Sequence, residues 1–291
     1  MHPDMGVLLR AVVVAAVALL GALPAARAAA SSLEVFHADS LAGPMKEIKK
    51  AFEETRAGVT VSLTSGTSKH LAERILKGDA CDVFAPSSPA VIDDDLMHKR
   101  IGGSGAEAAS WYVVFSANEM VVVTRKGNPL QIRGVADLAR PGVTLLRITA
   151  EKDLATNRTI EFLTRAAAHE GKPELARTII DGTVGDPSRP SSVPDTIRAV
   201  SGGKADAGVV YYSAAVAARN ELDIIRFPAN VNLSDRIRNA ASVPGTARNG
   251  KLAVEFVAFL LSAQGQRILQ ETGQPPVVPA IRKGNVPAEL R

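Results

Sequence analysis

Apolar residues along this chain change their spacing repeatedly, from every second position to every third or fourth. Short runs of β-type residues predict strands, at residues 33–36, 59–63, 81–85, 120–124, 143–146, 207–211 and 223–227. Stretches with helical spacing follow them, at residues 43–55, 71–76, 91–98, 156–169, 174–180, 195–200, 213–220, 252–261 and 264–271. Strands that alternate with helices are typical of an α/β fold with parallel strands.

Two of the predicted strands end in small polar residues directly before a helix. The first is followed by His37-Ala38-Asp39-Ser40 and the second by Ser65-Gly66-Thr67-Ser68. The unpaired N–H groups and the positive dipole end of a helix N-terminus favour an anion. A single serine at such a place is most simply a helix cap. Two such junctions together indicate a cradle for an oxyanion.

Tyr211 and Tyr212 lie at a third junction between a strand and a helix. A phenol there can donate a hydrogen bond to an oxyanion, and adjacent tyrosines can also ligate ferric iron. The structural alternative is that one ring packs in the core and the other is exposed, since tyrosine is often half-buried. The residues alone leave these alternatives open.

The first 28 residues have the pattern of a secretory signal peptide. Arg10 precedes an uncharged apolar run at residues 11–23, and Ala26-Arg27-Ala28 fits a cleavage site with small residues. A membrane anchor is the alternative, but a run of about 13 residues is too short to cross a bilayer comfortably. We therefore expect residues 1–28 to be removed on export.

Composition excludes several classes of protein. The formal net charge of +4 is small for 291 residues and the basic residues are scattered, so nothing indicates a nucleic-acid surface. The one cysteine, Cys81, cannot form a disulfide within the chain. Stability must therefore come from a core, for which a hydrophobic content of 46% is ample.

Motifs for catalysis and for cofactors are absent from the sequence. It contains no Walker-type phosphate loop, no dinucleotide-binding glycine pattern and no G-x-S-x-G elbow, and its histidines lack metal-ligand spacing. We interpret His37 as a solvated or capping histidine. A hydrolase that uses Ser40 or Ser68 is an alternative, but neither serine has a recognisable base nearby. We expect no enzyme activity and no cofactor.

Several stretches share a pattern with one known family. They are residues 35–41 (VFHADSL), 65–68 (SGTS), 71–75 (LAERI), 82–85 (DVFA), 111–112 with 115, 118–121 (NEMV), 261–266 (LSAQGQ) and 274–280 (QPPVVPA). Together they resemble the periplasmic molybdate- and tungstate-binding proteins of ABC importers. The resemblance extends over about residues 33–281, and the last two stretches are similar to the archaeal-type tungstate binders.

The resemblance implies a fold in two lobes. This is the type II periplasmic-binding-protein fold, in which two α/β lobes with mostly parallel sheets flanked by helices are joined by a two-strand hinge and hold the oxyanion between them. We place lobe one at residues 33–116 and 236–291 and lobe two at residues 117–235.

The family's ligand-binding residues fall, by resemblance, on Ser40, Ser68, Ala155, Val193 and Tyr211. Archaeal-type members add two carboxylates that complete octahedral coordination of the metal. One matches Asp153, but the other is Ser192 in this chain. The resemblance therefore favours a tetrahedral oxyanion held by hydrogen bonds. Arg158 and Arg189 lie nearby, and a bidentate arginine would also suit sulfate, phosphate or a carboxylate.

The implied function is high-affinity binding of molybdate or tungstate in the periplasm. The expected partner is an ABC permease in the inner membrane, to which a monomeric protein delivers the oxyanion; no nucleic-acid partner is expected. One alternative is ferric iron, bound through Tyr211 and Tyr212 with Asp39 or His37 as further ligands. Another is a different small anion, to which Asp153 would direct the site.

Overall fold

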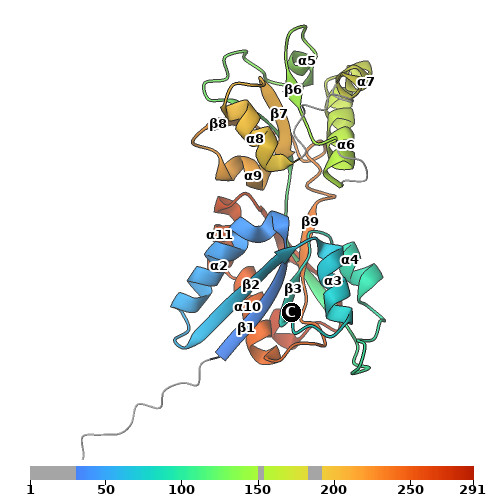
Figure 1. The fold of residues 1–291 in the computed structure, drawn as a ribbon, viewed down its shortest axis with the longest axis vertical. Helices are drawn as coiled ribbons and strands as arrows, with labels where there is room; N and C mark the ends of the chain where they lie inside the picture. The colour runs from blue at the N-terminus through green and yellow to red at the C-terminus, as the bar shows by residue number, and fades with distance from the viewer. Residues whose placement is uncertain (1–30, 150–153, 183–191) are drawn as a thin grey trace, which may run out of the picture.

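The structure is a computed structural model that describes residues 31–149, 154–182 and 192–291. Two lobes lie one above the other and are joined by extended segments of the chain (Figure 1). The signal peptide expected at residues 1–28 lies outside the described residues.

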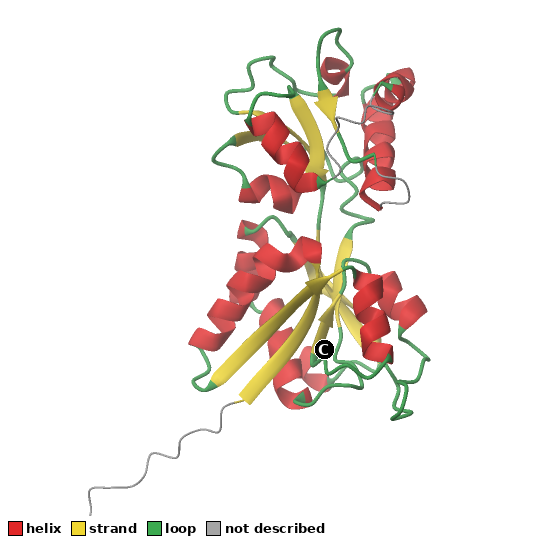
Figure 2. Ribbon diagram, viewed as in Figure 1, coloured by secondary structure: helices red, strands yellow, loops and turns green. Residues whose placement is uncertain are grey.

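A parallel sheet with strand order β2-β1-β3 forms one half of the lower lobe. Its strands are β1 (Ser31–Ala38), β2 (Val59–Gly66) and β3 (Val83–Ala85). Helices cover it on both sides (Figure 2), namely α2 (Ala42–Glu54), α3 (Ser68–Leu76), α4 (Pro89–Asp95), α10 (Gly250–Leu261) and α11 (Ala263–Glu271). The alternation of strands and helices predicted from apolar spacing is confirmed here.

A second sheet in the lower lobe consists of strands that apolar spacing did not predict. They are β4 (Trp111–Ala117), β9 (Arg238–Ala241) and β10 (Pro276–Gly284), in the order β10-β4-β9, and both pairs are antiparallel. All seven residues of β4 are buried, and its aromatic and β-branched residues form a run of the same kind as at residues 120–124, so the prediction missed a signal that was present. Two short 3-10 helices complete the lobe, η1 (Asp39–Leu41) and η2 (Ala288–Leu290).

The upper lobe has one sheet in the order β6-β7-β5-β8. Its strands are β5 (Met120–Arg125), β6 (Leu145–Leu146), β7 (Ala207–Tyr211) and β8 (Leu222–Ile225). The helices around it are α5 (Val135–Leu138), α6 (Leu154–His169), α7 (Pro173–Asp181), α8 (Val193–Ser201) and α9 (Tyr212–Ala217).

The expectation of mostly parallel sheets needs a correction, although the α/β class is confirmed. Only β1–β2, β1–β3 and β6–β7 pair in parallel. Strand β4 pairs antiparallel with β10 and β9, and β5 pairs antiparallel with β7 and β8. The reason is the path of the chain. It leaves the lower lobe through β4 and enters the upper through β5, then returns between β8 and β9, so strands on the outward path lie against strands on the return path.

Within the described residues, no single helix is long and apolar enough to cross a membrane. Helices α10 and α11 together pass such a test of length and composition, but they are bent by 63° at the break between them. Leu252, Phe256 and Leu260 of α10 are buried in the core of the lower lobe.

Candidate functional site

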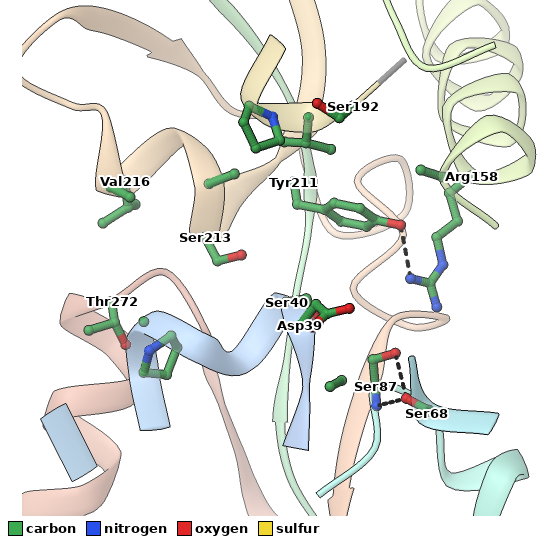
Figure 3. Close-up of a pocket in the computed structure, with 18 of the residues that line it drawn as sticks. Asp39, Ser40, Ser68, Ser87, Arg158, Ser192, Tyr211, Ser213, Val216 and Thr272 are labelled. Carbon is green, nitrogen blue, oxygen red and sulfur yellow. Dashed lines mark hydrogen bonds between the residues drawn. The ribbon is translucent and has the colours of Figure 1, made fainter. Parts of the chain in front are cut away.

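A cleft of about 1350 Å³ lies between the two lobes (Figure 3). Its lining includes five of the six predicted site residues, Ser40, Ser68, Ala155, Val193 and Tyr211. The sixth, Asp153, lies outside the described residues, as does Arg189. Segments that lie far apart in the sequence therefore meet at one place.

Ser40 and Ser68 reach the lower wall of the cleft at the ends of neighbouring parallel strands. Strand β1 ends at Ala38 and Ser40 follows within η1; strand β2 ends at Gly66 and Ser68 begins α3. Ser68 Oγ accepts a hydrogen bond from the backbone N–H of Ser87 at 3.1 Å. Because a hydroxyl has one hydrogen to donate in addition to its lone pairs, this bond leaves the Ser68 hydrogen available to an acceptor in the cleft.

Ser87 is a cleft residue that the sequence analysis did not identify. It follows β3 and lies just before α4, and its Oγ is 3.4 Å from Ser68 Oγ. A serine between a buried strand and a helix is the same arrangement as at Ser40 and Ser68. That pattern could have identified Ser87 from the sequence.

The upper wall is formed by the starts of two helices and the end of a strand. Ala155 is buried in the first turn of α6, Val193 is the first residue of α8, and Tyr211 is the last residue of β7. The first N–H groups of a helix have no partner within it, so Val193 can offer its backbone N–H. Tyr211 Oη accepts a hydrogen bond of 3.1 Å from Arg158 Nη1 (Figure 3).

Ser192, which the resemblance matches to a carboxylate position, is the N-cap of α8. Its Oγ accepts from the backbone N–H of Asp195 at 3.2 Å and donates to Asp195 Oδ2 at 2.5 Å. This hydroxyl is the main cause that lowers the pKa of the Asp195 carboxyl. Ser192 is therefore engaged by its own helix.

The two adjacent tyrosines do not converge on the cleft. Tyr211 lines it, whereas Tyr212 lies beneath Arg226, whose Cζ is 4.5 Å from the ring centroid. Arg226 in turn is paired with the buried Glu119 at 2.6 Å. Both tyrosines are half-buried, so the alternative of one core ring and one exposed ring is wrong.

The interpretation of His37 as a solvated or capping residue is wrong. It is 2% exposed, because β1 is the central strand of its sheet and continues past His37 to Ala38. Its Nδ1 lies 2.9 Å from the carbonyl oxygen of Ala38, and it does not line the cleft. Among the described residues there is no group of three or more His, Cys, Asp or Glu side chains placed to hold a metal ion.

His37 is expected to make stability depend on pH. Burial lowers its pKa below the ordinary 6.5, against opposing effects of the Ala38 carbonyl and Asp39. As pH falls below about 6.5, His37 is protonated in the unfolded chain but stays neutral in the folded one. The free energy of unfolding therefore falls as pH drops from there towards the lowered pKa of the folded state. Urea unfolding at about pH 7.5 and 5.5 should show a larger loss in the parent than in His37→Asn. Equal losses would contradict this assignment.

Residues 33–274 match the family model described as bacterial extracellular solute-binding protein. The molybdate-binding protein ModA of Mycobacterium tuberculosis is 30% identical over 245 residues, which cover 84% of each chain. The molybdate/tungstate-binding protein WtpA of Pyrococcus abyssi is 24% identical over 319 residues, covering 90% of this chain and 89% of that one.

Solved structures share the fold at lower identity. A substrate-binding domain from Clostridium difficile, assigned to a molybdenum ABC transporter, has a TM-score of 0.67 at 22% identity and covers 85% of this chain and 99% of its own. Iron-bound HitA from Pseudomonas aeruginosa has a TM-score of 0.59 at 20% identity, with coverages of 89% and 92%. Proteins with this fold thus carry different ligands, and the choice among them must come from the residues of the cleft.

Proposed function

Because this chain belongs to the bacterial extracellular solute-binding protein family, we propose that it binds molybdate or tungstate between its lobes and delivers it to an ABC permease in the inner membrane. The observation that carries the proposal is the meeting of Ser40 and Ser68 from the lower lobe with Val193 and Tyr211 from the upper lobe in one cleft. Family membership implies a periplasmic or extracellular location, and we infer a monomer in the periplasm.

Hydrogen-bond donors that carry no charge would surround most of the oxyanion. Ser40, Ser68 and Tyr211 offer hydroxyl groups, and Val193 offers a backbone N–H at the start of α8. The N-termini of α3 and α8 each add about 0.3–1 kcal/mol of dipole stabilisation. Closure of the lobes would remove water from the ion and strengthen each of these bonds.

We infer a tetrahedral oxyanion rather than an octahedrally coordinated metal. Octahedral coordination would need two carboxylates, and the second of these positions is Ser192. Ser192 Oγ is bonded to Asp195 within the first turn of α8. Hydrogen-bond donors alone can hold a tetrahedral dianion, so this mode of binding does not need the second carboxylate.

A thermal-shift screen of the mature protein tests the proposal. Molybdate, tungstate, sulfate, phosphate and ferric iron would be added in turn. A ligand at 100 times its Kd stabilises the folded protein by about 2.7 kcal/mol, which gives an easily measured rise in Tm. We expect a rise with molybdate and tungstate. A protein that responds to neither would refute the proposal, and a response to ferric iron alone would establish the iron alternative.

Tyr211→Phe is expected to weaken the oxyanion complex by about 1–3 kcal/mol, because one buried donor is lost. An iron complex would instead be almost abolished, since the phenolate would be a metal ligand. Isothermal titration calorimetry measures the change. Tyr212→Phe is the matched control, because its ring lies outside the cleft and its affinity should equal that of the parent. A larger loss in Tyr212→Phe than in Tyr211→Phe would contradict the assigned site.

A further inference from the structure

We propose that Arg158 is a specificity-determining residue of the cleft, which contacts the anion directly, directs the Tyr211 hydroxyl towards it, and so selects tetrahedral oxyanions of charge −2 over those of charge −1. The inference rests on the proposed function. The uncharged donors of that site leave Arg158 without a role, and the inference supplies one.

The first support is the direction of the bond between Arg158 and Tyr211. A guanidinium has only donors, so in the 3.1 Å contact the Tyr211 oxygen accepts. The phenolic hydrogen must then point elsewhere, and Tyr211 lines the cleft. The Arg158 Cζ is 5.6 Å from the ring centroid, because the guanidinium reaches past the ring to its oxygen. Arg158 therefore holds Tyr211 as a donor to the ligand.

The second support is a charge that is not paired within the described residues. Arg165, on the same helix, binds both Glu161 and Asp235, and Arg226 binds Glu119. Among the described residues, the Arg158 side chain has no ion pair, and its only hydrogen bond is the one to Tyr211. Its side chain is half-buried and lines the cleft. The remaining N–H groups can therefore bind an anion that enters from solvent.

The third support is where the guanidinium lies. In Figure 3 it extends from α6 into the space between Tyr211 and the lower-lobe serines Ser68 and Ser87. An oxyanion on these serines would have the guanidinium on its upper side. Arginine binds two oxygens of such an ion at once, through charge-assisted bonds about twice as strong as neutral ones.

Charge selectivity follows from Coulomb's law. The attraction of Arg158 to the ligand scales with the ligand's charge, so the arginine favours a dianion over a monoanion of the same shape. Tungstate and perrhenate are suitable probes, because both are tetrahedral oxyanions of a heavy metal with similar size and they differ by one unit of charge. A larger preference for tungstate in the parent than in a variant without Arg158 is the signature.

The experiment measures the Kd of tungstate and of perrhenate by calorimetry in the parent and in Arg158→Met. We expect tungstate affinity to fall about 10- to 100-fold, the range for hydrogen bonds to a charged group, and perrhenate affinity to fall less. Arg177→Met is the matched control, because Arg177 is an exposed arginine of the same lobe that does not line the cleft. It should keep the parent's ratio of the two affinities.

Arg158→Lys keeps the experiment decisive if Arg158→Met folds poorly. Lysine retains the charge without the planar fork, so this variant should keep the preference for tungstate over perrhenate while losing part of the affinity for both. Unchanged tungstate binding in Arg158→Met, or an equal loss for the two anions, would overturn the role of Arg158 while leaving the proposed function intact. A parent that binds no oxyanion would overturn both.

Discussion

Phe52→Ala should lower the free energy of unfolding of the lower lobe by about 3–5 kcal/mol. The Phe52 ring is 0% exposed and packs edge-on against Phe256 and Phe259, with centroids 5.0 and 5.6 Å away. The Arg56 guanidinium covers it, with Cζ 4.0 Å from the ring centroid. Alanine would leave a cavity between α2 and α10 and remove the aromatic and cation–π contacts together.

Trp111 provides the measurement for this prediction. It is the only tryptophan of the chain and is buried in the same hydrophobic core as Phe52, so its fluorescence during urea unfolding reports on the lower lobe. Leu130→Ala in the upper lobe is the control, because Leu130 is already 38% exposed and should change the midpoint little. A loss below about 1 kcal/mol in Phe52→Ala would show that the three rings do not form the centre of this core.

Asn239→Leu should destabilise the protein by about 2–6 kcal/mol and also weaken the ligand complex. Asn239 Nδ2 donates to Ser116 Oγ at 2.9 Å and to Gln274 Oε1 at 2.7 Å, and all three residues are 0–1% exposed. Gln274 Nε2 donates to the backbone oxygen of Ser40 at 3.1 Å. Leucine would leave two buried acceptors without this donor, at about 1–3 kcal/mol each, and would loosen the Ser40 segment.

Two further variants separate this network from a general packing defect. Gln274→Leu should destabilise comparably, and the double variant should lose less than the sum, because both changes remove the same bond. Gln270→Leu, an exposed amide on α11, should stay within about 0.5 kcal/mol of the parent. Urea unfolding and calorimetry with molybdate give the two readouts. The network would be contradicted if the two losses in the free energy of unfolding were strictly additive. It would also be contradicted if Asn239→Leu bound molybdate as tightly as the parent.

Most local elements were predictable because their causes are local. Strand β1 and helix α2, for example, appear in the sequence as a short apolar run and a longer helical pattern, and the serine between them identifies the junction. Strands β9 and β10 were not predicted. β9 has only four residues, and β10 is largely exposed and contains Pro276 and Pro279, so pairing with β4 rather than strand propensity makes them strands.

Some residues of the candidate site were likewise predictable from the sequence, and the place of others became clear only in the structure. Sequence and resemblance together predicted Ser40, Ser68 and Tyr211 as ligand-binding residues, because each lies at the end of a strand before a helix, and all three line the cleft. They left Tyr212 open as a second ligand. In the structure Tyr212 is the first residue of α9 and does not line the cleft, and its ring lies against Arg226.

The sequence by itself determined an alternating α/β chain with small polar residues at the junctions between strands and helices, since apolar spacing and capping preferences act within a few residues. Only the tertiary structure decided which junctions meet. The contact between Arg158 and Tyr211 joins residues 53 apart in sequence. The hydrogen bonds from Asn239 to Gln274 and from Gln274 to Ser40 join β9, late in the sequence, to η1 near its start. Such contacts form through burial and pairing between distant segments, which no local pattern encodes.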